Sequence, residues 1–289
     1  MSNRMMVELR VLLRVFLVGQ FAALGLSSCG GGGAAVDLPP NVFQAYFESE
    51  SLGANCVAVG GGCPGGEFSE QKTEDPYSVT PVPPNSASVN VTVVNSPAAP
   101  QGSQVVRLSR RSDDFTSRRA QLSVYRISAL NALTTYYVHF YMYLPDTYTV
   151  YPWDGTHQGY LRLWEFIAWN GSQGLWHTTP GFFLKPGVSN KLQMQFAGFG
   201  SNANHTIDFS GTVPANQWVK FVVKFTRGIT NGAVTVWQDG VQVLNVSNRQ
   251  TTYSGAETFF SLDASGMTVS PSPMTVYFDD VQINQANIW

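Results

Sequence analysis

Short runs of alternating apolar and polar side chains are the feature that most constrains the fold of this chain of 289 residues. In the run Tyr136–Leu144, the side chains of Val138, Phe140 and Met142 fall on one face of an extended strand, because successive side chains of a strand point to opposite faces. Between residues 41 and 289, no stretch keeps a helical period once its glycines and prolines are considered. The sequence therefore predicts an all-β protein.

Turn signals separate further runs of the same type. The turn signals are Asn170-Gly171, Pro186-Gly187, Asn231-Gly232 and Asp239-Gly240. The other expected strands cover residues 104–108, 120–127, 159–167, 191–196, 218–225, 233–238 and 275–283. Many short strands joined by tight turns predict a single antiparallel β-sandwich of the jelly-roll type over residues 41–289.

Composition narrows the classes of function. Charged residues make up 12% of the chain, with 17 Lys+Arg, 19 Asp+Glu and a formal net charge of −2. They form no block of like charge, whereas binding to phosphate needs clustered Lys and Arg, so nucleic acid is not expected as a partner. The 7 Trp, 12 Tyr and 18 Phe residues can fill a large core, which argues against a disordered chain.

The N-terminal segment has the pattern of an export signal. Arg4, Arg10 and Arg14 precede the apolar run from Val15 to Leu26. This run is too short to cross the hydrocarbon core of a bilayer as a stable helix. We therefore expect the protein to be exported.

The end of this signal resembles the lipobox of bacterial lipoproteins, on the residues Leu26-Ser27-Ser28-Cys29. The resemblance implies that residues 1–28 are a signal peptide, that Cys29 is lipidated and that the protein is anchored in the outer membrane by this lipid alone. Residues 29–40 start with a glycine run and are expected to form a flexible tether. A plain secretory cleavage site is the alternative.

Two cysteines remain after the anchor. Cys56 and Cys63 flank a glycine-rich segment, and an exported domain lies in an oxidising compartment, so we expect a disulfide between them. A zinc site is disfavoured, because no histidine is near and the Cys-x6-Cys spacing is not that of a zinc knuckle.

Four segments near the two ends of the domain form a recognisable set: Phe43–Ser49, Asn216–Phe225, Gly228–Val243 and Val276–Ile283. This set resembles the concanavalin A-like lectin/glucanase superfamily, in particular its heparin-lyase-like and alginate-lyase-like polysaccharide lyases. The resemblance implies a jelly roll whose first and last strands pair, with Phe47 and Glu48 beside Asp279 and Asp280. It also implies that one curved sheet forms an open groove for a polysaccharide, including one that contains uronate.

Strand alternation selects the side chains expected in this groove. Four strands offer a polar, aromatic and weakly cationic face. Aromatic rings cover the C–H surfaces of sugars, and Arg, Gln and His offer hydrogen bonds. We expect substrate binding at Tyr125, Tyr137, Arg162, Trp164, Lys191, Gln193 and Gln195. An ordinary solvent-facing sheet surface, which also alternates, is the alternative.

A candidate active site follows from a second resemblance. Arg119-Ala120-Gln121-Leu122 is similar to the Arg-x-Glu-Leu strand of alginate-lyase-like enzymes, with Gln in place of Glu. By this resemblance, Arg119 and Gln121 would hold a uronate carboxylate. His139 and Tyr141, same-face neighbours on one strand, would exchange protons during β-elimination. The Gln-x-His strand and the late Tyr-rich motif of that family are not recognisable in this sequence.

Other functions stay open. A retaining glycoside hydrolase is not expected, because the paired carboxylates it needs are absent and Glu165 stands alone in its strand. The same groove would serve a non-catalytic, lectin-like lipoprotein that binds carbohydrate. A structural or adhesive envelope protein is the third reading.

No cofactor is required for β-elimination, but a structural calcium ion is a further candidate. Jelly-roll carbohydrate modules often hold such an ion near an Asp of the final strand, and oxygen ligands suit it. Glu48, Asp279 and Asp280 are the residues that this expectation names. In the alternative, one of the two aspartates faces solvent and the other caps a turn.

Overall fold

The computed structural model describes residues 41–48, 68, 70–74, 89–112, 118–124, 135–152, 161–170, 175–196, 206–252, 257–266 and 268–287. The chain divides into two compact units, Met1–Asp37 and Leu38–Trp289, and all described residues belong to the second. Cys29, Cys56, Cys63 and Tyr125 lie outside the described residues. In the described part, no helix is long and apolar enough to cross a membrane.

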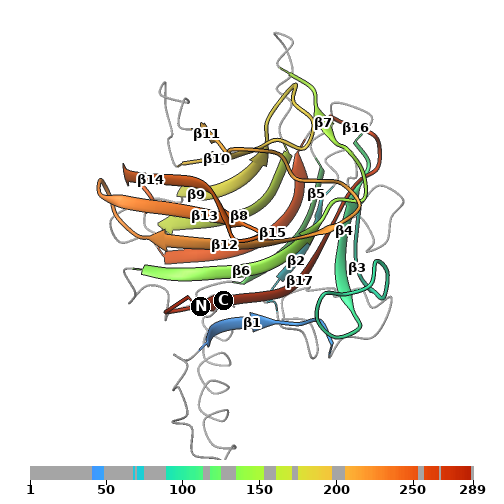
Figure 1. Cartoon of the computed structure of the whole chain (residues 1–289), viewed down its shortest axis with the longest axis horizontal. Helices are drawn as coiled ribbons and strands as arrows, with labels where there is room; N and C mark the ends of the chain where they lie inside the picture. Colours follow the sequence, from blue (N-terminus) through green and yellow to red (C-terminus); the bar gives the residue numbers. More distant parts are fainter. Residues whose placement is uncertain are drawn as a thin grey trace, which may run out of the picture. The chain divides into compact units, whose positions relative to one another are not determined.

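Eight strands form the first sheet, called sheet A. They are β1 (Asn41–Ala45), β3 (Val89–Val94), β4 (Val105–Arg110), β6 (Thr135–Tyr143), β12 (Trp218–Thr226), β13 (Gly232–Gln238), β14 (Val241–Arg249) and β17 (Met274–Asn284). Their order is β14-β13-β12-β6-β17-β4-β3, and β1 also pairs with β17. Figure 1 shows β14, β13, β12, β6 and β17 as successive ribbons.

Seven strands form the second sheet, called sheet B. They are β2 (Glu70–Glu74), β5 (Arg118–Val124), β8 (Leu161–Asn170), β9 (Leu175–Leu184), β10 (Leu192–Gln195), β11 (Thr206–Asp208) and β15 (Glu257–Gly266). Their order is β11-β10-β9-β8-β15-β5-β2. The short strands β7 (Thr149–Val150) and β16 (Val269–Ser270) form a separate pair. All strand pairs are antiparallel, so the predicted all-β sandwich of the jelly-roll type is confirmed.

An aromatic core holds the two sheets face to face. Phe140 of β6 in sheet A lies 6.1 Å from Trp164 of β8 and 5.9 Å from Phe182 of β9, measured between ring centroids. All three side chains are fully buried. Burying each of them stabilises the fold by roughly 2 to 3 kcal/mol on an area scale. Side chains that alternate with these core residues point outward, on opposite sides of the sandwich.

The first and last strands pair, as the resemblance implied. Ala45 of β1 lies opposite Val281 of β17, while the earlier part of β17 pairs with β4. The pairing of β17 with β6 shifts register between Asp279 and Gln282, and Asp280 has a φ of 46°. Such a bulge bends a strand and redirects its side chains.

The turn signal Asp239-Gly240 is confirmed. Asp239 has a φ of 49° and Gly240 a φ of 80°, which is the left-handed pair that a two-residue hairpin turn of type I′ requires. The Asp239 carboxylate accepts a hydrogen bond of 2.9 Å from the backbone N–H of Lys220. The hairpin of β13 and β14 is thereby fixed to the start of β12.

Candidate functional site

The sequence-predicted site residues lie on two different faces of the sandwich. Arg119 and Gln121 belong to β5 in sheet B, whereas His139 and Tyr141 belong to β6 in sheet A. Outward side chains of the two sheets point away from each other, so the single groove expected from the sequence is not formed. The chain crosses from one sheet to the other between these consecutive strands, and alternation along a strand carries no signal for that crossing.

The outer face of sheet B brings together five of the predicted residues. Directly opposite residues of neighbouring strands share a face. The first set, called the arginine row, runs through Arg119, Ser265, Arg162, Phe183 and Gln193. The second set, called the glutamate row, runs through Ser123, Ser261, Glu165, Gly181 and Gln195. Gln121 lies opposite Asp263 between the two rows.

A hydrogen-bonded network crosses three strands at the centre of this face. Gln121 Nε2 donates to Ser261 Oγ at 3.1 Å, and Ser261 Oγ donates to Asp263 Oδ2 at 2.7 Å. Arg162 Nη1 donates to Glu165 Oε2 at 2.6 Å, and Arg162 Nε lies 3.9 Å from Asp263 Oδ2.

The central side chains of this network are almost entirely buried: Gln121 is 2% exposed, Glu165 1% and Asp263 0%. Charges in such surroundings need partners, and the ion pair and hydrogen bonds supply them. Asp263 Oδ1 is buried without a hydrogen-bond partner within the described part of the chain. The network therefore holds Arg162 in place and leaves one carboxylate oxygen unused.

The remaining predicted residues of sheet B lie at the far strand. Gln193 and Gln195 alternate with the buried Leu192 and Met194 of β10, so both amides are on the outer face. Lys191 directly precedes β10, is half-buried, and accepts a hydrogen bond from the backbone N–H of Lys185 through its own carbonyl. Amides thus extend the polar face beyond Arg162.

Trp164 is not on this face, contrary to the sequence-based prediction. Its indole is fully buried and lies 4.9 Å from Phe182 and 5.1 Å from Phe166, measured between ring centroids. The pairing of β8 with β9 shifts register between Arg162 and Trp164. This bulge breaks simple alternation, so Arg162 faces outward while Trp164 packs in the core and Glu165 faces outward again.

His139 lies on the outer face of sheet A between two neighbouring strands. It is opposite Val222 of β12 on one side and Gln282 of β17 on the other, and its side chain is fully buried. Burial, with the positive charge of Lys220 as a second cause, lowers the pKa of His139 to about 4. The ring is therefore neutral at pH 7, the form a base needs, but it offers no surface to a polymer.

Tyr137 and Tyr141 are half-buried neighbours of His139 on the same face. Tyr141 lies opposite Lys220 and Asp279, and burial is the main cause that raises its pKa. Lys224 Nζ lies 6.0 Å from the centre of the Tyr137 ring, a cation–π distance. These residues form a surface distinct from that of sheet B.

Glu48 and Asp279 hold the segment 101–104 against the paired first and last strands. Glu48 Oε1 accepts the backbone N–H groups of Ser103 at 2.7 Å and Gln104 at 2.8 Å. Asp279 Oδ2 accepts the backbone N–H of Gln101 at 3.0 Å. We call these contacts the carboxylate latch.

The carboxylate latch does not fit the expected calcium site. The oxygens of Glu48 and Asp279 face N–H and O–H donors, and Asp280 Oδ1 accepts from Gln282 Nε2 at 2.6 Å. Among the residues that the structure describes, no group of three or more His, Cys, Asp or Glu side chains could hold a metal ion.

Asp279 has the most perturbed carboxylate environment of the latch. Burial raises the pKa of Asp279 to about 7, and the neighbouring charges of Asp280 and Glu48 act in the same direction. Hydrogen bonds from the backbone of Gln101 and Asp280 lower it in part. In contrast, hydrogen bonds from Ser103 and Gln104 lower the pKa of Glu48.

Sequence reasoning missed Ser261 and Asp263. The signal was present in Phe260–Ser265, where Ser261, Asp263 and Ser265 alternate with buried apolar residues. This is the pattern of a strand with one polar face. Two serines and one aspartate on a strand do not form a catalytic motif, so the sequence alone does not mark them as site residues.

The comparisons with known proteins show the fold. No protein-family model matches the chain, and no curated protein matches it. Among solved structures, an endo-β-1,4-glucuronan lyase from the fungus Trichoderma reesei is similar, with a TM-score of 0.55 and 15% identity over 76% of this chain and 96% of that chain. A mutant of the alginate lyase Aly36B in complex with alginate trisaccharide has a TM-score of 0.53 and 10% identity, over 86% and 99%. The fold is thus shared with polysaccharide lyases.

Proposed function

We propose that this chain is a polysaccharide-lyase-like protein that binds a uronate-containing polysaccharide across the outer face of sheet B. One observation carries the proposal: the arginine row sets Arg119 and Arg162 on either side of Ser265. Guanidinium groups donate hydrogen bonds to carboxylates in a fixed planar fork.

The two arginines have different roles in this proposal. Arg162 is held by Glu165 and Asp263, so its guanidinium is fixed before any ligand arrives. Arg119 lies at the next strand but one, half-buried, where it would meet a uronate carboxylate. Neutralising that carboxylate acidifies the C5 proton, which is the first requirement of β-elimination.

The length of the face suits a polymer. The two rows cross five strands of sheet B, which at a spacing of about 4.8 Å between strands is about 19 Å. Gln193 and Gln195 extend it with amide donors and acceptors. The similar solved structures support the same class of ligand, because they are named as a glucuronan lyase and an alginate lyase in complex with alginate trisaccharide.

The proposal is tested by incubating the full chain with glucuronan, with alginate and with an uncharged β-glucan as control. β-Elimination leaves a C4–C5 double bond, so a lyase gives a rise in ultraviolet absorbance with a uronate polymer and none with the β-glucan. Isothermal titration calorimetry on the same polymers measures binding without turnover.

The outcomes separate the three candidate functions. A rise in absorbance supports a lyase, and binding to a uronate polymer without it supports a lectin-like protein on the same face. If a folded sample neither binds nor cleaves any uronate polymer, the proposal is overturned and a structural or adhesive role is favoured.

We further propose that the protein is exported and anchored in the outer membrane by a lipid on Cys29. The support is the sequence pattern Leu26-Ser27-Ser28-Cys29 followed by glycines. Processing that is blocked by globomycin and lost in Cys29→Ser is the expected result. Normal processing of Cys29→Ser would show plain secretion.

A further inference from the structure

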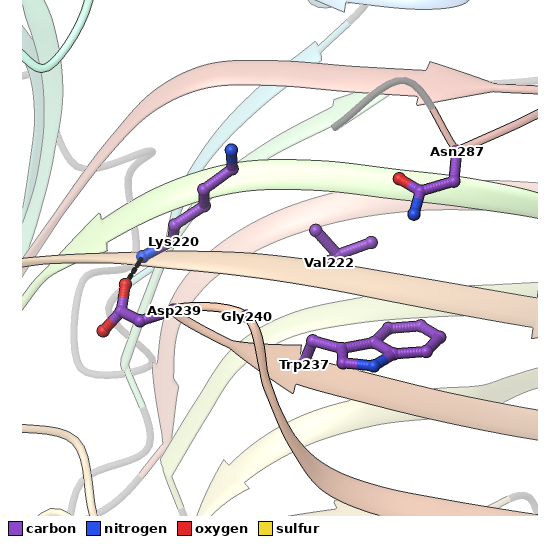
Figure 2. Close-up of a pocket in the computed structure, with 6 residues that line it drawn as sticks. All are labelled: Lys220, Val222, Trp237, Asp239, Gly240 and Asn287. Carbon is purple, nitrogen blue, oxygen red and sulfur yellow. Dashed lines mark hydrogen bonds between the residues drawn. The ribbon is translucent and has the colours of Figure 1, made fainter.

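The outer face of sheet A contains a depression that the proposed function does not use. It has a volume of about 540 Å³ and is lined by Lys220, Val222, Trp237, Asp239, Gly240 and Asn287. Figure 2 shows the indole of Trp237 beside Val222, with the side chains of Lys220 and Asn287 bordering the same space. The volume lies in the range of pockets that take small ligands.

Two neighbouring strands, the turn between β13 and β14, and the segment after β17 build this depression. Lys220 and Val222 alternate with core residues on β12, and Trp237 comes from the next strand, β13. The dashed line in Figure 2 is the hydrogen bond from the Lys220 backbone N–H to Asp239 Oδ1, at 2.9 Å. The backbone N–H of Asp239 donates in return to the Lys220 carbonyl at 2.9 Å. This double contact fixes the wall next to the turn.

The lining has the chemistry of a saccharide site. An indole ring presents a flat apolar surface to the C–H face of a pyranose. Around it, the Lys220 ammonium donates hydrogen bonds, the Asp239 carboxylate accepts them and the Asn287 amide does both. A ring of hydroxyl groups needs both kinds of partner at its edge.

The charge balance decides between an acidic and a neutral ligand. Lys220 is the cation of the lining, and the charges of Asp280 and Asp239 both act on it. His139, which lies opposite Val222, adds no positive charge near neutral pH because burial keeps it neutral. The lining itself carries one lysine and one aspartate, so a carboxylate or sulfate would meet no net positive charge, and an uncharged sugar is favoured.

We propose that this depression, lined by Trp237, Lys220 and Asn287, is a second ligand site that binds a neutral saccharide unit. The site lies on the opposite side of the sandwich from the arginine and glutamate rows. It would let the protein hold an uncharged glycan while sheet B binds an acidic one. The inference does not depend on activity at sheet B.

The test is a titration of the full chain with neutral tetrasaccharides built of glucose, mannose, galactose or xylose, followed by calorimetry. We expect at least one to bind, and Trp237→Ala to weaken that binding tenfold or more. Asn287→Ala, from a different element, should weaken it several-fold. Trp218→Ala is the control, because it removes a tryptophan of β12 from the same face of sheet A but outside the depression; it is expected to leave the affinity unchanged.

The proposal is overturned if no neutral tetrasaccharide binds to the folded protein, or if both Trp237→Ala and Asn287→Ala bind as the wild type does. It is also overturned if uronate oligosaccharides compete for the same site. Trp237→Tyr keeps a ring and serves where the alanine variant does not fold; its affinity should fall between those of wild type and Asn287→Ala. Uronate binding measured on the same variants should not change, which separates this site from that of sheet B.

Discussion

At Asp279, burial and hydrogen bonding have opposite effects on the pKa of one carboxylate. Its Oδ2 accepts the backbone N–H of Gln101, which ties segment 101–104 to β17, and its Oδ1 accepts the backbone N–H of Asp280, yet its side chain is fully buried. Burial therefore raises the pKa of Asp279 to about 7 although the hydrogen bonds lower it. The contribution of Asp279 to the free energy of unfolding therefore depends on pH.

We expect Asp279→Asn to change the pH dependence of stability. The pKa of about 7 in the folded state exceeds the ordinary value of 3.8, so protonation favours the folded state. The contribution of Asp279 is fully present below about pH 4 and is lost as the pH rises to about 7. In urea unfolding, the stability of Asp279→Asn relative to that of the wild type should therefore rise as the pH is raised from 5 to 8.

Asp146→Asn is the control for this change, because it removes an exposed carboxylate by the same substitution. A difference between Asp279→Asn and wild type that stays constant from pH 5 to pH 8 would contradict the explanation. The amide keeps only one of the two side-chain oxygens that accept backbone N–H groups, so a constant difference in stability at all pH values is also expected and does not decide the matter.

At the level of elements, alternation located strands well but did not assign them to sheets. The predicted strand 136–144 matches β6, and 218–225 matches β12. Alternation has a period of two along one strand, so it states which side chains share a face of that strand. It holds no information on whether β5 and β6 are in the same sheet, and they are not.

Bulges account for the residue that sequence reasoning misplaced. With Leu161 and Leu163 on the core face, strict alternation would place Glu165 on the core face as well, but the register shifts of β8 turn it outward. Trp164 therefore faces the core and Glu165 faces outward. The cross-strand partners of Arg162 depend on the register of β8 with β15 and β9, which alternation along one strand does not specify.

The carboxylate latch predicts that a side chain added at Gly102 lowers the free energy of unfolding. This residue has a φ of 66°, and an added Cβ would lie 2.3 Å from Glu48 Oε1. Gly187 has a φ of 74° and no atom within 4 Å of an added Cβ, so it provides a matched control. Gly187→Ala should cost about 1 to 2 kcal/mol of unfolding free energy from backbone strain alone.

Gly102→Ala should cost more than Gly187→Ala, by about 1 kcal/mol or more, because the latch must open and lose hydrogen bonds from Ser103 and Gln104. Unfolding in urea measures both variants. Equal costs would mean that the Glu48 contacts do not stabilise the fold.

On the scale of the whole molecule, the sandwich has two polar surfaces on opposite sides, whereas the sequence analysis predicted that their residues line one groove. Sheet B gathers arginines and amides around a buried ion pair, whereas sheet A gathers tyrosines, a neutral histidine and a tryptophan-lined depression. The shared fold with polysaccharide lyases is compatible with ligands on either face. We propose sheet B as the binding surface for the acidic polysaccharide because the arginine row lies there.

The most direct test compares one arginine from each face. Arg119 lies on the outer face of sheet B, and Arg107 lies opposite Tyr277 in sheet A. Affinity for a uronate polymer, measured by calorimetry, should fall tenfold or more in Arg119→Ala, since a charge-assisted hydrogen bond contributes about 1.5 to 3 kcal/mol. Arg107→Ala should bind as wild type. Unchanged binding by Arg119→Ala, or a loss confined to Arg107→Ala, would contradict the assignment to sheet B.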